Sequence, residues 1–278
     1  MPRLRLDADR LRGDAEHSLS ELPYRSGGRY RSVETSPNIG RDGTSLMRVG
    51  AVIQARFSSQ RLPGKVLRPL CGKPLLAHLI DRLRRSAVLD IIGVATSTEP
   101  SDDAVAQFCA EAEIACHRSA LDSVLGRIRG AAQQFQLDGI LQLSGDSPLL
   151  DPALVRQAVK LFRRGGWDLV TNVQIRSFPD GQSVEILSAD GLARVAKKAR
   201  AGTERGHVTS YLYAHPQEFR IRNLVARVPR PTLRLSVDTA EDFARIEAIL
   251  TAAGARADRL DLDEVAELAD LLAPEEPV

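Results

Sequence analysis

The 278-residue chain contains few lysine, cysteine, methionine and aromatic residues. Only five of its 38 basic residues are lysines, and 36 acidic residues leave a net charge of +2. So small an excess of positive charge argues against a nucleic-acid-binding protein, because such proteins neutralise many phosphates. No stretch approaches 18 consecutive apolar residues, so no membrane span is predicted.

The three cysteines, Cys71, Cys109 and Cys116, are odd in number and have no CxxC spacing. This pattern argues against a disulfide framework and against a zinc site. We expect small buried side chains in a reducing compartment, which predicts a cytoplasmic protein.

The first 46 residues are polar and lack a sustained apolar period or the apolar core of a secretory signal, so we predict a disordered leader. The chain has only two methionines, Met1 and Met47, and Met47 stands just before the first apolar run. A translation start at Met47 is therefore a hypothesis, which N-terminal sequencing of the native protein would test. Residues 47–278 are predicted to form the folded domain.

From residue 49 short apolar runs alternate with helical periods, which predicts βαβ units and a mostly parallel sheet covered on both faces. The predicted strands are 49–55, 90–95, 114–116, 139–143 and 167–171. After residue 172 the rhythm breaks, so residues 173–230 are interpreted as a small inserted lobe. Residues 233–237 are predicted to return to the main sheet, followed by helices over 239–250 and 262–272.

Ligands of open α/β sheets bind beyond the carboxyl ends of the strands. The first such end is followed by Arg56, Ser58, Arg61 and Lys65, a set that could cradle a polyphosphate. The loop is neither a Walker A sequence nor a GxGxxG sequence, and it could also be simply a solvated basic loop.

Two further strand ends carry carboxylates, Asp146 after Gly145 and Asp238 after an alternating apolar run. Each could merely cap the next helix. Together, facing a basic loop, they match what a Mg²⁺-nucleotide needs, because Mg²⁺ prefers one or two carboxylates with phosphate oxygens and water. The combination points to nucleotidyl transfer.

The first of these loops, with its flanking residues, resembles the signature loop of the sugar-acid cytidylyltransferases, which include the acylneuraminate and 3-deoxy-manno-octulosonate cytidylyltransferases. The matching residues are Gln54-Ala55-Arg56-x-Ser58-Ser59-x-Arg61-Leu62-Pro63-Gly64-Lys65-Val66-Leu67. Weaker matches follow in order, namely Leu70-x-Gly72-Lys73-Pro74-Leu75, Val94-Ala95-Thr96-Ser97, Gly145-Asp146-x-Pro148-Leu149, Glu204-Arg205-x-His207-Val208-Thr209 and Val237-Asp238-Thr239-x-Glu241-Asp242. The likeness spans about residues 49–272 and is greatest to the spore-coat-polysaccharide branch.

The resemblance implies a Rossmann-like nucleotidyltransferase fold and a Mg²⁺-dependent transfer of CMP from CTP to a sugar acid in surface polysaccharide synthesis. It implies that Arg61 and Lys65 are catalytic and stabilise the leaving pyrophosphate. The implied nucleotide-binding residues are Ala55, Arg56, Ser58, Thr96, Ser97 and Gly145, the implied metal ligands are Asp146 and Asp238, and the acceptor-side candidates are Glu185, Arg205 and His207. No general base is evident, so we expect positioning with the metal to suffice for catalysis.

Two departures from the family pattern, Ser183 and Gly206, lie where the acceptor sugar is expected, so the acceptor stays open. The expected partners are CTP and an acidic sugar, with no nucleic acid and no membrane, and a homodimer could form through residues 204–214. The alternatives are a nucleotidyltransferase that uses another nucleotide or a sugar phosphate, a catalytically silent sugar-nucleotide-binding protein, and a glycosyltransferase. Against the last, Asp261-Leu262-Asp263 spells a DxD motif but opens a helix instead of following a strand.

Overall fold

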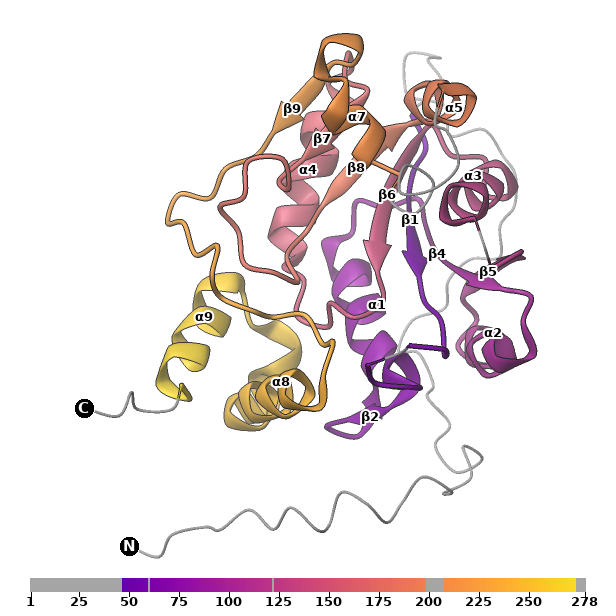
Figure 1. Ribbon diagram of the computed structural model, residues 1–278. Helices are drawn as coiled ribbons and strands as arrows, with labels where there is room; N and C mark the ends of the chain where they lie inside the picture. Colours follow the sequence, from indigo (N-terminus) through magenta and orange to yellow (C-terminus); the bar gives the residue numbers. More distant parts are fainter. Residues whose placement is uncertain (1–46, 60, 122, 199–207, 274–278) are drawn as a thin grey trace, which may run out of the picture.

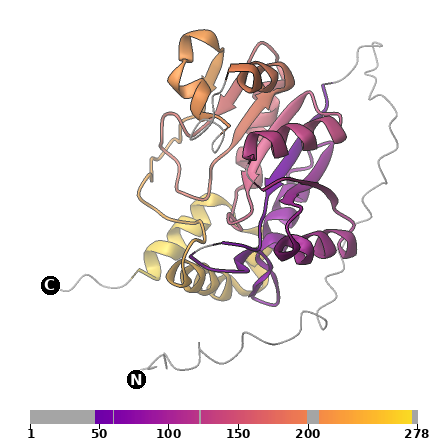
Figure 2. The same cartoon turned by 45° about the vertical axis from the view of Figure 1, so that its right-hand side comes forward.

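The computed structural model describes residues 47–273 with the exception of 60, 122 and 199–207 (Figure 1). The predicted leader lies outside the described residues, and so do residues 204–207 of the predicted dimer contact over 204–214. A central sheet runs through the molecule, with helices on both sides and α8 and α9 side by side at one end (Figures 1 and 2).

The central sheet has seven strands in the order β5-β4-β1-β6-β8-β7-β9. The strands are β1 (Val49–Gln54), β4 (Ile91–Ser97), β5 (Ala115–Ser119), β6 (Gly139–Ser144), β7 (Leu169–Thr171), β8 (Glu185–Ser188) and β9 (Ile221–Asn223). β1 pairs in parallel with β4 and β6, and β4 pairs in parallel with β5. The predicted mostly parallel α/β sheet is therefore confirmed.

The helices follow the predicted alternation. They are α1 (Leu75–Ser86), α2 (Asp103–Glu111), α3 (Val124–Gln134), α4 (Pro152–Arg163), α5 (Ala189–Lys198), α7 (Ser210–Ala214), α8 (Ala240–Ala253) and α9 (Leu262–Leu271). Pro152 begins α4 as the first helical residue, where its missing N–H costs nothing, and the Asp151 side chain caps the helix. A small hairpin of β2 (Pro69–Leu70) and β3 (Lys73–Pro74) precedes α1.

Successive residues of β1 face opposite layers of the molecule. Val49, Ala51 and Ile53 belong to the apolar cluster that includes α1, α2 and α4, whereas Val52 belongs to the cluster that includes α3, α5 and α7. A strand buried on both faces needs a continuous apolar run, which is why the sequence of β1 identified it.

The stretch interpreted as an inserted lobe contributes two strands to the central sheet. β8 pairs antiparallel with both β6 and β7, and β9 pairs in parallel with β7. An antiparallel strand needs no crossover helix, so the break in the βα rhythm did not mark an exit from the sheet. The proposed lobe boundaries of 173–230 stay a prediction.

The predicted strand over 233–237 is wrong. This segment forms one isolated bridge, between Arg234 and Asp180, in which the Asp180 N–H donates to Leu233 and the Leu235 N–H donates to Asp180. Leu235 and Val237 point instead into a third apolar cluster with α8 and α9, and this burial produced the alternating pattern.

Candidate functional site

The loop after β1 has its shape fixed at both ends. The Phe57 N–H donates to the buried Asp102 carboxylate at 2.7 Å, and the Gly64 N–H donates back to the Phe57 carbonyl at 2.8 Å. Gly64 has a φ of 70°, a left-handed conformation that favours glycine. Arg56 and Ser58 are exposed on this loop, so they are available to a ligand.

Lys65 ends the loop with an ammonium group that has three partners. Its Nζ donates to the Val237 carbonyl at 2.7 Å and to one carboxylate oxygen each of Asp146 and Asp238 at 3.0 Å. The residue is only 8% exposed. An ammonium group has three N–H donors, so all the donors of Lys65 are engaged within the protein.

The two candidate metal ligands lie side by side although Asp146 follows β6 and Asp238 follows a segment that is not a strand. The Val237 N–H donates to the Asp146 carbonyl at 2.9 Å, which holds the two segments together. At Gly145 a Cβ atom would stand 3.1 Å from the Gln54 carbonyl, so glycine permits this close approach to the end of β1. The Arg61 guanidinium adds a 2.9 Å ion pair to Asp238.

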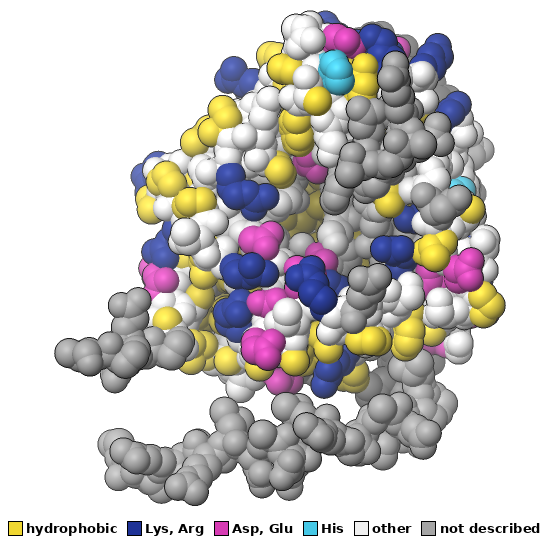
Figure 3. Space-filling model, viewed as in Figure 1, with side chains coloured by type: hydrophobic (Ala, Val, Ile, Leu, Met, Phe, Trp, Pro, Cys, Tyr) yellow, Lys and Arg dark blue, Asp and Glu magenta, His cyan; other side chains and the backbone are white. Residues whose placement is uncertain are grey.

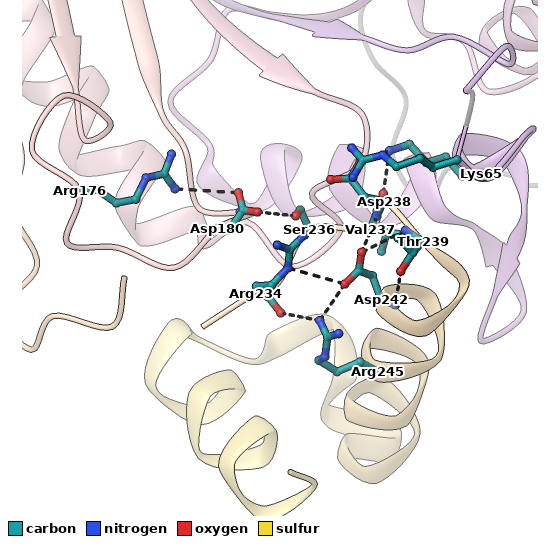
Figure 4. Close-up of polar contacts among 12 residues, drawn as sticks. Lys65, Arg176, Asp180, Arg234, Ser236, Val237, Asp238, Thr239, Asp242 and Arg245 are labelled. Carbon is teal, nitrogen blue, oxygen red and sulfur yellow. Dashed lines mark hydrogen bonds and ion pairs between the residues drawn. The ribbon is translucent and has the colours of Figure 1, made fainter. Parts of the chain in front are cut away.

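Asp242, which the sequence reading left without a role, positions Asp238 (Figure 4). Its carboxylate accepts from the N–H groups of Asp238 and Thr239, and the Thr239 hydroxyl caps α8 in return. Burial would raise the pKa of Asp242, but these N–H groups and the Arg245 guanidinium hold it below the usual value. The Thr239-x-x-Asp242 spacing of a capping box was the signal that could have found it.

Thr96 and Ser97 are not among the described residues that line the cleft, and their predicted contact with the nucleotide stays a prediction. Both residues are fully buried, and the Ser97 hydroxyl donates to Asp102 while accepting from the Glu99 N–H. Ser97 supports the loop from behind, through the same Asp102 carboxylate that holds Phe57. Nothing in the sequence marked Asp102, which precedes α2 as an ordinary helix-start residue.

A cleft of about 310 Å³ opens beside Asp146 and Asp238. Its described lining includes the predicted Asp146, Asp238 and Glu185, together with Asp180, which was not predicted. The buried side chain of Ala55 lies next to Gly145, and the predicted contact of the Ala55 backbone with the nucleotide stays a prediction. The other two acceptor-side candidates, Arg205 and His207, lie outside the described residues.

Asp146 and Asp238 fit a magnesium ion in a nucleotide complex. Their carboxylate oxygens share one cation already, the Lys65 ammonium, so they lie close enough to hold another. In the described part of the chain no group of three or more His, Cys, Asp or Glu side chains could hold a metal alone. Two carboxylates completed by phosphate oxygens and water are the ligand set that Mg²⁺ prefers with nucleotides.

On the face seen in Figure 3, basic and acidic side chains lie next to one another in the middle of the molecule. Asp261 of the DxD sequence serves as the cap of α9, in a capping box with Glu264. This local role agrees with the reading of that motif as a helix start. Among the described residues no helix is both long and apolar enough to cross a membrane.

A sequence model of the cytidylyltransferase family matches residues 51–270. The chain belongs to this family. It is 34% identical over 214 residues to the spore coat polysaccharide biosynthesis protein SpsF of Bacillus subtilis, covering 74% of this chain and 88% of that protein. The family membership makes the chain a nucleotidyltransferase and confirms the resemblance seen in the sequence.

Two further similarities agree. The 8-amino-3,8-dideoxy-manno-octulosonate cytidylyltransferase of Shewanella amazonensis is 38% identical over 132 residues, which are 45% of this chain and 52% of that enzyme. A solved cytidylyltransferase structure from Leptospira borgpetersenii superposes with a TM-score of 0.77 at 26% identity, covering 81% of this chain and 94% of that one. The nucleotidyltransferase fold is thereby confirmed.

Proposed function

We propose that this cytidylyltransferase transfers CMP from CTP to a sugar acid with Mg²⁺ and releases pyrophosphate. The proposed role is in surface polysaccharide synthesis, which agrees with the name of the Bacillus relative, while the sugar-acid acceptor agrees with the name of the Shewanella relative. A cytoplasmic location and a homodimer stay predictions from the sequence.

One observation carries the proposal: the Lys65 ammonium joins Asp146 and Asp238 at the end of the loop that carries the exposed Arg56 and Arg61. Basic groups and two adjacent carboxylates are what a triphosphate with its metal requires. When bound there, Mg²⁺ would reduce the repulsion between the phosphates and an attacking oxygen.

The reaction forms a bond from an acceptor hydroxyl oxygen to the α-phosphorus and breaks the bond from that phosphorus to the pyrophosphate oxygen. Arg61, whose side chain is 62% exposed, can swing from Asp238 to the leaving pyrophosphate. Lys65 must give up at least one of its three partners to reach a phosphate. Substrate binding would therefore change the contacts of Lys65 with the two carboxylates. Charge developing on the pyrophosphate would then meet these two cations.

Pyrophosphate release tests the proposal. We expect release with CTP and a sugar acid in the presence of Mg²⁺, and little with the other three nucleoside triphosphates. Absence of release with every combination of nucleotide and sugar acid would overturn the proposed reaction and favour a silent sugar-nucleotide-binding protein.

A further inference from the structure

Three polar side chains form a row across one face of the central sheet. Glu185 of β8 stands opposite Gln142 of β6 on one side and Thr171 of β7 on the other. Residues paired in this way project to the same face. Two residues further along each of these strands, the same face of the sheet is apolar and buried. There Ile140, Leu187 and Leu169 pack in one cluster. The change from apolar to polar side chains therefore occurs where the sheet meets the cleft.

A chain of hydrogen bonds orients Glu185. The Tyr213 hydroxyl of α7 donates to Glu185 Oε1 at 2.5 Å and lies 2.8 Å from the Thr171 hydroxyl. The Thr171 hydroxyl accepts from the Val173 N–H. Because the single hydroxyl proton of Tyr213 goes to Glu185, the Thr171 hydroxyl donates its own proton to Tyr213. Burial, with the nearby Glu185 charge, raises the pKa of Tyr213 and keeps it a donor. Glu185 is thus held as an acceptor at the cleft wall.

Gln142 has one acceptor atom left over. Its Nε2 donates to Glu185 Oε2 at 2.8 Å, an assignment that follows because a carboxylate only accepts. Its Oε1 is then buried with no partner among the described residues, although the side chain lines the cleft and is 9% exposed. A buried acceptor without a donor costs free energy, which a donor entering from the cleft would recover.

The charges along this wall are unbalanced at Glu185. The described lining of the cleft includes four carboxylates and no lysine or arginine. Asp146 and Asp238 share the Lys65 ammonium, and Asp180 has the Arg176 guanidinium at 4.0 Å. Within the described residues Glu185 has no basic side chain within the 4.0 Å limit of an ion pair. Glu185 is half-buried, and a half-buried carboxylate without a counter-charge nearby favours a cationic ligand.

We propose that Glu185 and Gln142 recognise an ammonium group on the acceptor, so that the preferred acceptor is an amino-substituted sugar acid. This inference rests on the proposed transfer of CMP to a sugar acid. An ammonium group offers three donors and a positive charge, which match the free lone pairs of Glu185 and the unpartnered Oε1 of Gln142. The acceptor's own carboxylate would be repelled by this wall and must face another side of the cleft.

The test compares acceptors that differ only by an amine in place of a hydroxyl. One pair is 8-amino-3,8-dideoxy-manno-octulosonate and 3-deoxy-manno-octulosonate, and the panel continues with sugar acids in which one hydroxyl at a time is exchanged. The enzyme is assayed with CTP and Mg²⁺ as the wild type, as Glu185→Gln, and as Glu267→Gln, a matched control on the exposed side of α9. Calorimetric titration with the same acids measures binding apart from turnover.

We expect at least one amino form to exceed its hydroxyl partner by about tenfold or more in kcat/KM. Glu185→Gln should remove that preference, and Glu267→Gln should keep it. Equal or better use of every hydroxyl form by the wild type, or an unchanged preference in a folded Glu185→Gln, would overturn the ammonium site. Amine-dependent binding lost in Glu185→Gln, without pyrophosphate release, would keep the site and overturn the transfer reaction. Neither release nor amine-dependent binding would overturn both.

Discussion

Lys65 and Asp238 are 173 positions apart in the chain, and the ammonium of the first donates to the carboxylate of the second at 3.0 Å. The same nitrogen holds Asp146 at 3.0 Å. One buried cation therefore ties the loop after β1 to the end of β6 and to the segment that leads into α8. Its removal would leave two carboxylates close together without their shared counter-charge, and this arrangement makes the site testable one side chain at a time.

Replacement of Lys65 by alanine should lower turnover by about a thousandfold or more, because a preorganised positive charge at the pyrophosphate is lost. Steady-state pyrophosphate release measures this effect. Lys73→Ala is the matched control. Lys73 is half-buried and, like Lys65, pairs with two carboxylates, those of Asp81 and Asp258, but it stands away from the cleft. We expect that control to keep its turnover. A Lys65→Ala rate near that of the wild type would rule out the phosphate role.

Asp146→Asn should abolish the Mg²⁺-dependent reaction, because an amide replaces one of the two carboxylates that Mg²⁺ prefers. A titration of pyrophosphate release against Mg²⁺ concentration measures the change, and circular dichroism checks that the variant folds. Asp190→Asn, an exposed carboxylate on α5, serves as the control and should match the wild type. An unaltered Mg²⁺ dependence in Asp146→Asn would count against its role as a ligand.

The buried carboxylate of Asp102 should make stability fall in acid. Burial would raise its pKa, but the donors of Ser97 and Phe57 hold the pKa below the ordinary value of 3.8. The stabilising contribution is therefore complete above that value and is lost as the pH falls below it. Asp102→Asn should be less stable than the wild type at pH 7, and the difference should narrow between about pH 5 and pH 2.

Urea unfolding at a series of pH values measures this difference. Asp103→Asn changes the same charge at the neighbouring position, where the side chain is 65% exposed, and should show a smaller loss at pH 7. A constant gap between Asp102→Asn and the wild type across the whole range would contradict the expected contribution.

Gly181→Ala should destabilise the protein by several kcal/mol. The residue has a φ of 86°, and an added Cβ would stand 2.5 Å from the Leu235 backbone. Gly165→Ala is the matched control, because its φ of 82° is similar while nothing lies within 4 Å of its Cβ position. That control should cost about 1 kcal/mol, from the left-handed backbone alone. Equal losses for the two variants in urea unfolding would refute the steric argument.

Local patterns were enough to predict several elements. β1 is a continuous apolar run, and α4 begins at Pro152, since proline favours the first position of a helix. These signals are local because burial on both faces and the fixed φ of proline act within a few residues. The same local alternation misled at 233–237, where the buried residues face helices instead of a sheet.

The supporting residues of the site could not be found this way. Asp102 and Tyr213 act through groups that are 45 and 28 positions away in the chain, at Phe57 and Glu185. A side chain of this kind looks like any other helix residue until its partner is known. Gln142 gave a faint signal as a polar residue inside an apolar strand, whose meaning depends on the antiparallel neighbour β8.

The sequence by itself determined the family, the parallel half of the sheet and the loop that carries Arg61 and Lys65. Each of these is recognised from residues that lie near one another in the chain. Only the tertiary structure decided that Lys65 lies between Asp146 and Asp238 and that Glu185 and Gln142 share one wall of the cleft. The reason is physical: strand order brings together side chains that are distant in the chain, and charge compensation is a property of that packed arrangement.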